Sequence, residues 1–322
     1  MTDETATTSK RAVRVAIVGA GNVGATCAYA LLLNGTAAEI VLIDANRERA
    51  EGEAMDLNHG MPFTRPARVW AGDYADCAIA DVVVLTAGAA QRPGETRLDL
   101  LKRNAAVFQQ IVPQVVQHTR EAILLVAANP LDALTYAAWK TSGLPASRVV
   151  GSGTILDTAR FRYLLGQRFG VEPRSVHAFI IGEHGDSQVA IWSLANIAGM
   201  RLDDFCRMNG GTLDAEAKRE IAQNARRAAY DIIRRKGATY YAIAAALVRI
   251  IEAIVRDQNS VLTVSSLAEN VYGLNDVCLS LPGVVNRQGV SRVLLLPLDA
   301  EERGALENSA RIIREAIATL SL

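Results

Sequence analysis

Four side chains of this sequence are suited to proton transfer on an anionic substrate. His184 lies within the run Gly182–Asp186, Asp157 and Arg160 are separated by two residues, and Arg97 lies upstream of all three. A carboxylate beside a histidine favours the protonated ring, and an arginine binds a carboxylate through two parallel hydrogen bonds. A proton-carrying imidazole next to arginines that bind an anion is what the reduction of a 2-keto acid requires.

The composition limits the class of protein. The 322 residues include 34 Lys+Arg and 34 Asp+Glu, and 50% of them are hydrophobic. This length suits one large domain or two moderate ones with a sizeable core. Balanced charge without a basic run argues against a nucleic-acid partner, so a few placed arginines should meet any bound anion.

Cysteine usage and the apolar runs indicate the cellular compartment of the protein. The four cysteines are far apart and form no Cys-x-x-Cys, so we expect neither a metal site nor a disulfide framework, and isolated thiols suit a reducing cytoplasm. No apolar run has the length of a membrane span, and none of signal-peptide type follows the N-terminus. We therefore expect a cytoplasmic protein without membrane association, with residues 1–11 as a flexible tail.

Short apolar runs alternate with helical patterns through the first half of the chain. Such alternation indicates an α/β fold, with a parallel sheet covered by helices on both faces. The expected strands are Val13–Val18, Ile40–Ile43, Arg68–Ala71, Val82–Thr86, Ile123–Val126 and Val149–Val150. The expected helices are Asn22–Leu33, Glu48–Leu57, Asn104–Gln117 and Leu131–Thr141.

The pattern changes after Gly151. A helix at Ile155–Phe169 opens a region in which we expect shorter strands, such as Val176–Ile181 and Val293–Pro297. We assign residues 12–151 to one domain and 152–322 to an α+β domain packed tightly against it. Long helices are expected at Asp214–Arg235, Ala238–Arg256 and Ala300–Leu320.

A glycine-rich loop follows the first expected strand. Its G-x-G-x-x-G spacing allows a tight turn, close approach of a pyrophosphate to the backbone, and packing of the next helix on the strand. The helix N-terminus attracts the anion. This context predicts a Rossmann-type doubly wound sheet that binds a dinucleotide. The expected contacts in the loop are Gly19, Gly21, Asn22, Val23 and Gly24.

Asp44 ends the second expected strand, 20 residues after Gly24. An acidic side chain at this position bonds both ribose hydroxyls and repels a 2′-phosphate, so the predicted cofactor is NAD rather than NADP. The alternative is that Asp44 caps the following helix.

The polar loop that follows the fourth expected strand begins at Gly88 and includes Arg97. Ligands bind beyond the carboxyl ends of strands in open α/β sheets, so we expect this loop to close over a substrate. The alternative is an ordinary solvated loop.

Longer motifs identify a family. The chain resembles the bacterial-type L-lactate dehydrogenases of the lactate/malate dehydrogenase family, and the motifs follow the family's order over nearly the whole chain. They are the Gly19–Gly24 loop, Gln91–Leu100, Asn129–Asp132, Gly151–Arg162, Gly182–Asp186 and Lys236–Tyr241.

The resemblance implies reversible hydride transfer between NADH and pyruvate, giving L-lactate and NAD+. His184 is then the proton donor and acceptor, and Asp157 holds its ring and raises its pKa. Arg160 clamps the substrate carboxylate, and Arg97 polarises the keto oxygen. Each residue also has an alternative without a catalytic role. His184 is then a core or turn histidine, and Asp157 a surface residue at a helix terminus. Arg160 forms only an ion pair with Asp157, and Arg97 is a mobile surface charge.

The resemblance extends to neighbouring residues. Asn129 contacts both substrate and nicotinamide, and its bond to Pro130 is a candidate cis peptide. Thr239 lies near the substrate in the family, although on sequence alone it reads as a helix N-cap. Further implied cofactor contacts are Arg49, Tyr74, Gly88, Ala89 and Ala127.

Gln91 indicates which keto acid is used. Malate dehydrogenases of the family carry arginine there to meet a second carboxylate, and burying that carboxylate unpaired costs about 3–5 kcal/mol. Pyruvate has only a methyl group at this end, so Gln91 favours pyruvate. A shift in loop register would present Arg92 instead, which leaves a malate or other 2-hydroxy-acid dehydrogenase as the alternative.

The resemblance also suggests regulation and assembly. Arg162 and His177 match the site for fructose 1,6-bisphosphate in allosteric bacterial members, and the family implies a homotetramer. The alternatives are a solvated helix arginine and a packed strand histidine. A non-catalytic NAD-binding protein is a further alternative, but such a protein needs no set like His184, Asp157, Arg160 and Arg97.

Overall fold

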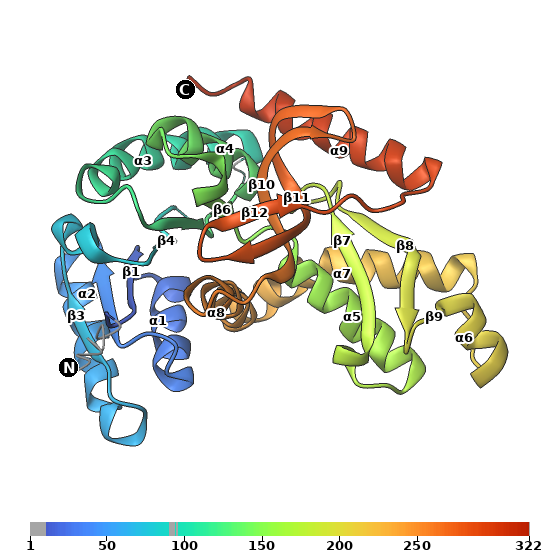
Figure 1. The fold of residues 1–322 in the computed structure, drawn as a ribbon, viewed down its shortest axis with the longest axis horizontal. Coiled ribbons are helices and arrows are strands. Elements are labelled where there is room, and N and C mark those ends of the chain that lie inside the picture. Colours follow the sequence, from blue (N-terminus) through green and yellow to red (C-terminus); the bar gives the residue numbers. More distant parts are fainter. Residues whose placement is uncertain (1–10, 90–93, 95, 322) are drawn as a thin grey trace, which may run out of the picture.

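The computed structural model describes residues 11–89, 94 and 96–321 of the chain (Figure 1). Two expectations therefore fall outside the described residues: the flexible tail, apart from Arg11, and the substrate-selecting Gln91 with its neighbour Arg92. Arg11 pairs with Asp81 at 2.7 Å.

A parallel sheet forms the core of the first half. Its strands follow the order β3-β2-β1-β4-β5-β6, and every neighbouring pair is parallel. The order reverses between β1 and β4, and ligands bind beyond the carboxyl ends of strands at such a point. This arrangement confirms the expected α/β doubly wound fold. The strands are β1 (Arg14–Val18), β2 (Glu39–Ile43), β3 (Arg68–Ala71), β4 (Val82–Leu85), β5 (Ile123–Val126) and β6 (Val149–Gly151).

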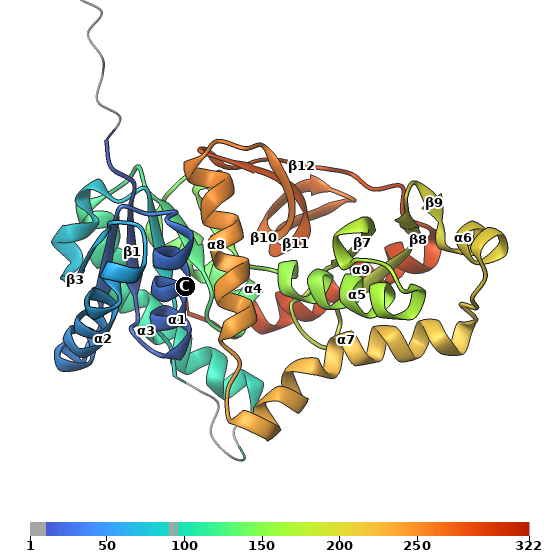
Figure 2. The same ribbon diagram turned by 90° about the horizontal axis from the view of Figure 1, so that it is seen from below.

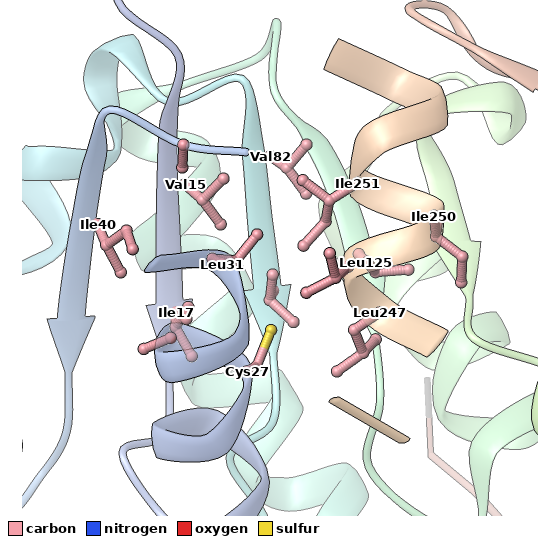
Figure 3. Packing of buried hydrophobic residues seen from close by; sticks show 14 of the residues in the cluster. Val15, Ile17, Cys27, Leu31, Ile40, Val82, Leu125, Leu247, Ile250 and Ile251 are labelled. Carbon is pink, nitrogen blue, oxygen red and sulfur yellow. The ribbon is translucent and has the colours of Figure 1, made fainter. Parts of the chain in front are cut away.

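Helices cover both faces of this sheet, which explains why β4 and β5 are buried along their whole length. Leu31 of α1 and Ile251 of α8 pack on one face, near Leu125 of β5 (Figure 3). Burial of one such side chain contributes about 1.5–3 kcal/mol, so α8 fastens the second half of the chain to the first. The helices are α1 (Asn22–Asn34), α2 (Arg47–His59) and α8 (Tyr241–Val255) on this face, with α3 (Arg97–His118) and α4 (Leu131–Ser142) on the other.

The second half extends the large sheet and adds a small one. Antiparallel strands β10 (Ser260–Val271), β11 (Leu274–Asn286) and β12 (Gly289–Val293) join the large sheet, where Ser265 of β10 lies opposite Gly151 of β6. The division into domains at residue 151 stays a prediction. The small sheet contains β7 (Val176–Ile181), β8 (Val189–Ile197) and β9 (Met200–Arg201).

Helices pack around the small sheet, and α7 runs beside α5 beneath it (Figure 2). They are α5 (Ile155–Phe169), α6 (Leu202–Asn209), α7 (Ala215–Lys236) and α9 (Ala300–Ile317). No helix within the described ranges is both long and apolar enough to cross a membrane.

Three expectations about elements were wrong. Helix α3 begins at Arg97 rather than Asn104, because Thr96 and Asp99 form a capping box. The segment after Val293 is not a strand, although Leu296 and Leu298 pack against the core like strand residues. The second half does not contain short strands alone: β7 spans Val176–Ile181 as expected, but β10 and β11 have 12 and 13 residues.

Candidate active site

The loop after β1 exposes backbone that a phosphate can approach. At Gly19, where φ is 108°, a Cβ would lie 2.5 Å from the backbone nitrogen of Ala87, and at Gly24 it would lie 1.9 Å from the Gly19 oxygen. The fold therefore requires glycine at both positions. Nothing lies within 4 Å of the Cβ position at Gly21, and no side chain caps the N-terminus of α1 that follows it. Open space before uncapped N–H groups fits the pyrophosphate of a dinucleotide.

Asp44 at the end of β2 holds this loop. Its Oδ2 accepts the Ala20 N–H at 2.7 Å and its Oδ1 accepts the Asn46 N–H at 2.9 Å. Asn46, not Asp44, caps α2 by accepting the Arg49 N–H, so the capping alternative for Asp44 is wrong. An ionised carboxylate has about four acceptor sites, which leaves sites for ribose hydroxyls. Tyr74 lies within electrostatic range of Asp44, and burial is the main cause that raises its pKa.

The carboxyl ends of β4 and β5 are tied together by a residue that the motifs did not reveal. Asn104 of α3 accepts the Ala89 N–H at 2.8 Å through Oδ1 and donates to the Asn129 carbonyl at 2.7 Å through Nδ2. Gly88 and Ala127 lie at these same strand ends. The bond between Asn129 and Pro130 is cis, as the sequence suggested. Asn104 therefore fixes the spacing of two loops predicted to contact cofactor and substrate.

His184, Asp157 and Arg160 come together in one cluster. His184 Nδ1 lies 2.5 Å from Asp157 Oδ2, and Arg160 Nη1 donates to Asp157 Oδ1 at 2.8 Å. The Ile180 N–H of β7 donates to Thr158 Oγ1 of α5 at 2.9 Å, which holds the helix against the strand that leads to His184. Asp157 is buried, so its reading as a surface residue is wrong. The Asp157–Arg160 ion pair is present.

The charges of this cluster favour a protonated histidine. Burial by itself lowers the pKa of His184, but the charge and hydrogen bond of Asp157 outweigh it, so the pKa lies above its ordinary value. Burial raises the pKa of Asp157, but His184 and Arg160 outweigh that effect and hold this pKa below its usual range. The pair therefore holds a proton on the imidazole to higher pH than an ordinary histidine would, with an ionised carboxylate beside it.

Arg97 contacts the two acidic residues that flank His184 on its loop. As the first residue of α3, it pairs with Asp186 at 3.0 Å and lies 4.0 Å from Glu183, on either side of His184 in the chain. Tyr230 of α7 hydrogen-bonds both Arg97 and Asp186. The Arg97 side chain remains half exposed, so it is placed at the mouth of the cluster rather than within it.

The remaining predicted residues lie farther from the cluster or in another setting. Thr239 precedes α8, whose N-cap position is Tyr240, so its reading as an N-cap is wrong. Arg162 of α5 is half-buried and donates to the Ala178 carbonyl at 2.9 Å, and it is not a solvated helix arginine. His177 of β7 is exposed, so it is not a packed strand histidine either.

Comparisons with known proteins show the family of the chain. Residues 13–151 match the model described as lactate/malate dehydrogenase, NAD binding domain, and residues 154–321 match its alpha/beta C-terminal domain. Together with the glycine-rich loop after β1 and the His184–Asp157 pair, these matches define an NAD-dependent oxidoreductase. The chain belongs to the lactate/malate dehydrogenase family.

Individual relatives resemble it over nearly its whole length. An L-lactate dehydrogenase from Acetivibrio thermocellus is 54% identical over 96% of this chain and 98% of its own, and one from Synechococcus sp. is 55% identical over 94% and 97%. The crystal structure of the minor L-lactate dehydrogenase from Enterococcus mundtii, in a ligands-bound form, has a TM-score of 0.94 at 43% identity and covers 97% of this chain and 100% of that one.

Proposed function

We propose that this protein is an L-lactate dehydrogenase that interconverts pyruvate and L-lactate, with His184 as proton donor and acceptor. The observation that carries the proposal is the contact of His184 Nδ1 with Asp157 Oδ2 at 2.5 Å, beside the Arg160 guanidinium. The names of relatives about half identical to the chain, at 54% and 55%, support lactate as the alcohol.

Each residue of the cluster has a separate task. Arg160 binds the substrate carboxylate with donors that Asp157 leaves unused, since a guanidinium has about five N–H groups and the ion pair engages one nitrogen. His184 donates a proton to the keto oxygen from the ring nitrogen that faces away from Asp157, and Asp157 stabilises the imidazolium until then. Arg97 breaks its ion pair with Asp186 and binds the keto oxygen, where it stabilises the developing negative charge. Bound NADH supplies the hydride, and NAD+ accepts it in the reverse direction.

The choice between pyruvate and oxaloacetate tests the substrate assignment. We expect kcat/KM for NADH oxidation with pyruvate to exceed that with oxaloacetate by at least about tenfold, because no arginine at position 91 meets the second carboxylate. Gln91→Arg should move the preference toward oxaloacetate. Arg92→Gln should leave the preference for pyruvate unchanged, and a change in this variant would instead support the shifted loop register. Equal use of both acids by the natural chain would favour the malate dehydrogenase alternative.

We also propose that the protein is a homotetramer with an activator site at Arg162 and His177. Apolar side chains on one surface support association: Phe63 is 89% exposed and Tyr241 of α8 is 69% exposed. They line a cavity of about 650 Å³ between α1, α2 and the start of α8. Large exposed apolar patches mark protein interfaces, and soluble oligomers usually associate through identical copies.

Titration with fructose 1,6-bisphosphate tests the activator site. At low pyruvate we expect a lower half-saturation concentration in the presence of the bisphosphate, because Arg162 pairs with a phosphate, and Arg162→Gln should lose this response. Light scattering on the same samples should give the mass of four chains. An unchanged half-saturation contradicts activation, and the mass of a single chain contradicts the assembly.

A further inference from the structure

A second carboxylate, Asp132, contacts the main chain of His184 and has no role in the mechanism above. Its side chain is buried in the first turn of α4. Asp132 Oδ2 accepts the main-chain N–H of His184 at 2.7 Å, and Oδ1 accepts the hydroxyl of Ser265 from β10 at 2.7 Å. One side chain thus joins α4, the loop after β7 and the strand that extends the large sheet.

Asp132 and Asp157 bind two different parts of His184. The main-chain N–H of His184 is fixed to one buried carboxylate, Asp132, while the ring of the same residue is fixed to another, Asp157. A hydrogen bond to a charged group is stronger than one between neutral groups. The two bonds therefore hold the loop backbone and the ring in a single arrangement.

The charge of Asp132 also reaches the imidazole. Burial raises the pKa of Asp132 to about 6, and the hydrogen bonds from Ser265 and His184 oppose this rise. The carboxylate is therefore ionised at neutral pH, and its charge is one of the causes that raise the pKa of His184. Of the other groups near it, Glu183 raises the pKa of Asp132, and burial keeps the Cys278 thiol neutral. Arg160 acts on His184 in the opposite direction.

We propose that Asp132 is a positioning residue for the reaction, which orients His184 through its main chain and helps to keep its imidazole protonated. The inference rests on the proposed role of His184 in proton transfer. A neutral asparagine could make similar hydrogen bonds at this position, so the specific contribution of aspartate is its charge.

The test is the pH dependence of kcat/KM for pyruvate reduction in the full chain carrying Asp132→Asn. Asparagine keeps the size and an acceptor for the His184 N–H but removes the charge. We expect the ratio of kcat/KM at pH 8 to that at pH 6 to fall by about five- to tenfold below the natural ratio, the size of a charge interaction over a few ångströms. Ser265→Ala should give a smaller fall in the same direction, because loss of its hydroxyl makes Asp132 harder to ionise. Its small size change keeps the test available where Asp132→Asn does not fold.

Glu302 provides a matched control. This buried carboxylate on α9 also accepts a main-chain N–H and a serine hydroxyl, both from Ser193, at 2.9 and 2.6 Å. We expect Glu302→Gln to lower stability without changing the pH ratio. A natural pH ratio in both Asp132→Asn and Ser265→Ala would overturn the proposal and leave Asp132 with a structural role alone. A natural enzyme whose reduction rate does not fall with pH would instead overturn the role of His184.

Discussion

Replacement of His184 by asparagine should lower kcat for pyruvate reduction by about 10²–10⁴-fold, the usual contribution of a positioned acid or base. Asparagine retains the main-chain N–H that Asp132 accepts, and its amide can still donate to Asp157. It cannot release a proton near neutral pH, so proton transfer fails while the site keeps its shape. The KM for pyruvate should change little, because Arg160 remains in place.

Steady-state NADH oxidation at saturating pyruvate measures this effect. His118→Asn is the matched control, because His118 is the exposed last residue of α3 and makes no contact proposed for the reaction. A His184→Asn variant that keeps a kcat within about threefold of the natural value, far below the usual effect of losing a general acid, would show that another group carries the proton.

Substitution of Arg160 by lysine should lower kcat/KM for pyruvate by about 10–150-fold, even though the positive charge is kept. One Arg160 nitrogen is engaged by Asp157 at 2.8 Å, and the fork leaves further donors for a carboxylate. A lysine has a single nitrogen and cannot bond Asp157 while binding a second carboxylate in two places. Loss of one charge-assisted hydrogen bond costs about 1.5–3 kcal/mol, which corresponds to this range.

The substitution should mainly raise KM and change kcat little, since the carboxylate is bound in both the ground state and the transition state. Arg168→Lys serves as control on the same helix, where Arg168 donates to the Thr212 carbonyl away from the cluster. An Arg160→Lys variant with natural kcat/KM would mean that the Asp157–Arg160 ion pair is structural and that the substrate carboxylate binds elsewhere.

The first half of the fold could be predicted because its signals are local. Each buried strand is a short apolar run, and the glycine loop between β1 and α1 requires residues without a Cβ at Gly19 and Gly24. The start of α3 was predicted seven residues late, although the Thr96–Asp99 capping box is visible in the sequence. The residues before Thr96 are also polar, so composition alone did not separate the loop from the first turn of the helix.

In the second half, the run after Val293 was predicted as a strand because apolar spacing alone does not separate a strand from an extended buried segment.

The candidate site likewise combines contacts that local sequence spacing predicts with contacts between residues far apart in the chain. Asp157 and Arg160 are neighbours on one helix, so their pairing follows from helical spacing. Asp132 and Ser265 are 133 residues apart, and Asp132 and the His184 N–H are 52 apart. The first contact depends on how antiparallel β10 joins the large sheet beside β6, and the second on the position of the loop after β7, which no local pattern encodes. The contacts of Asp132 with Ser265 and with the His184 main chain were therefore visible only in the folded chain.

The most direct test of proton transfer by His184 is the pH dependence of both directions of the reaction in the natural enzyme. Because the pKa of His184 is raised, its acid form persists above its ordinary range and is lost as pH rises through the shifted pKa. Pyruvate reduction needs that acid form, and lactate oxidation needs the neutral base. We predict that kcat/KM for pyruvate falls and kcat/KM for lactate rises over the same interval. Two profiles that change in the same direction, or do not change, would contradict proton transfer by His184.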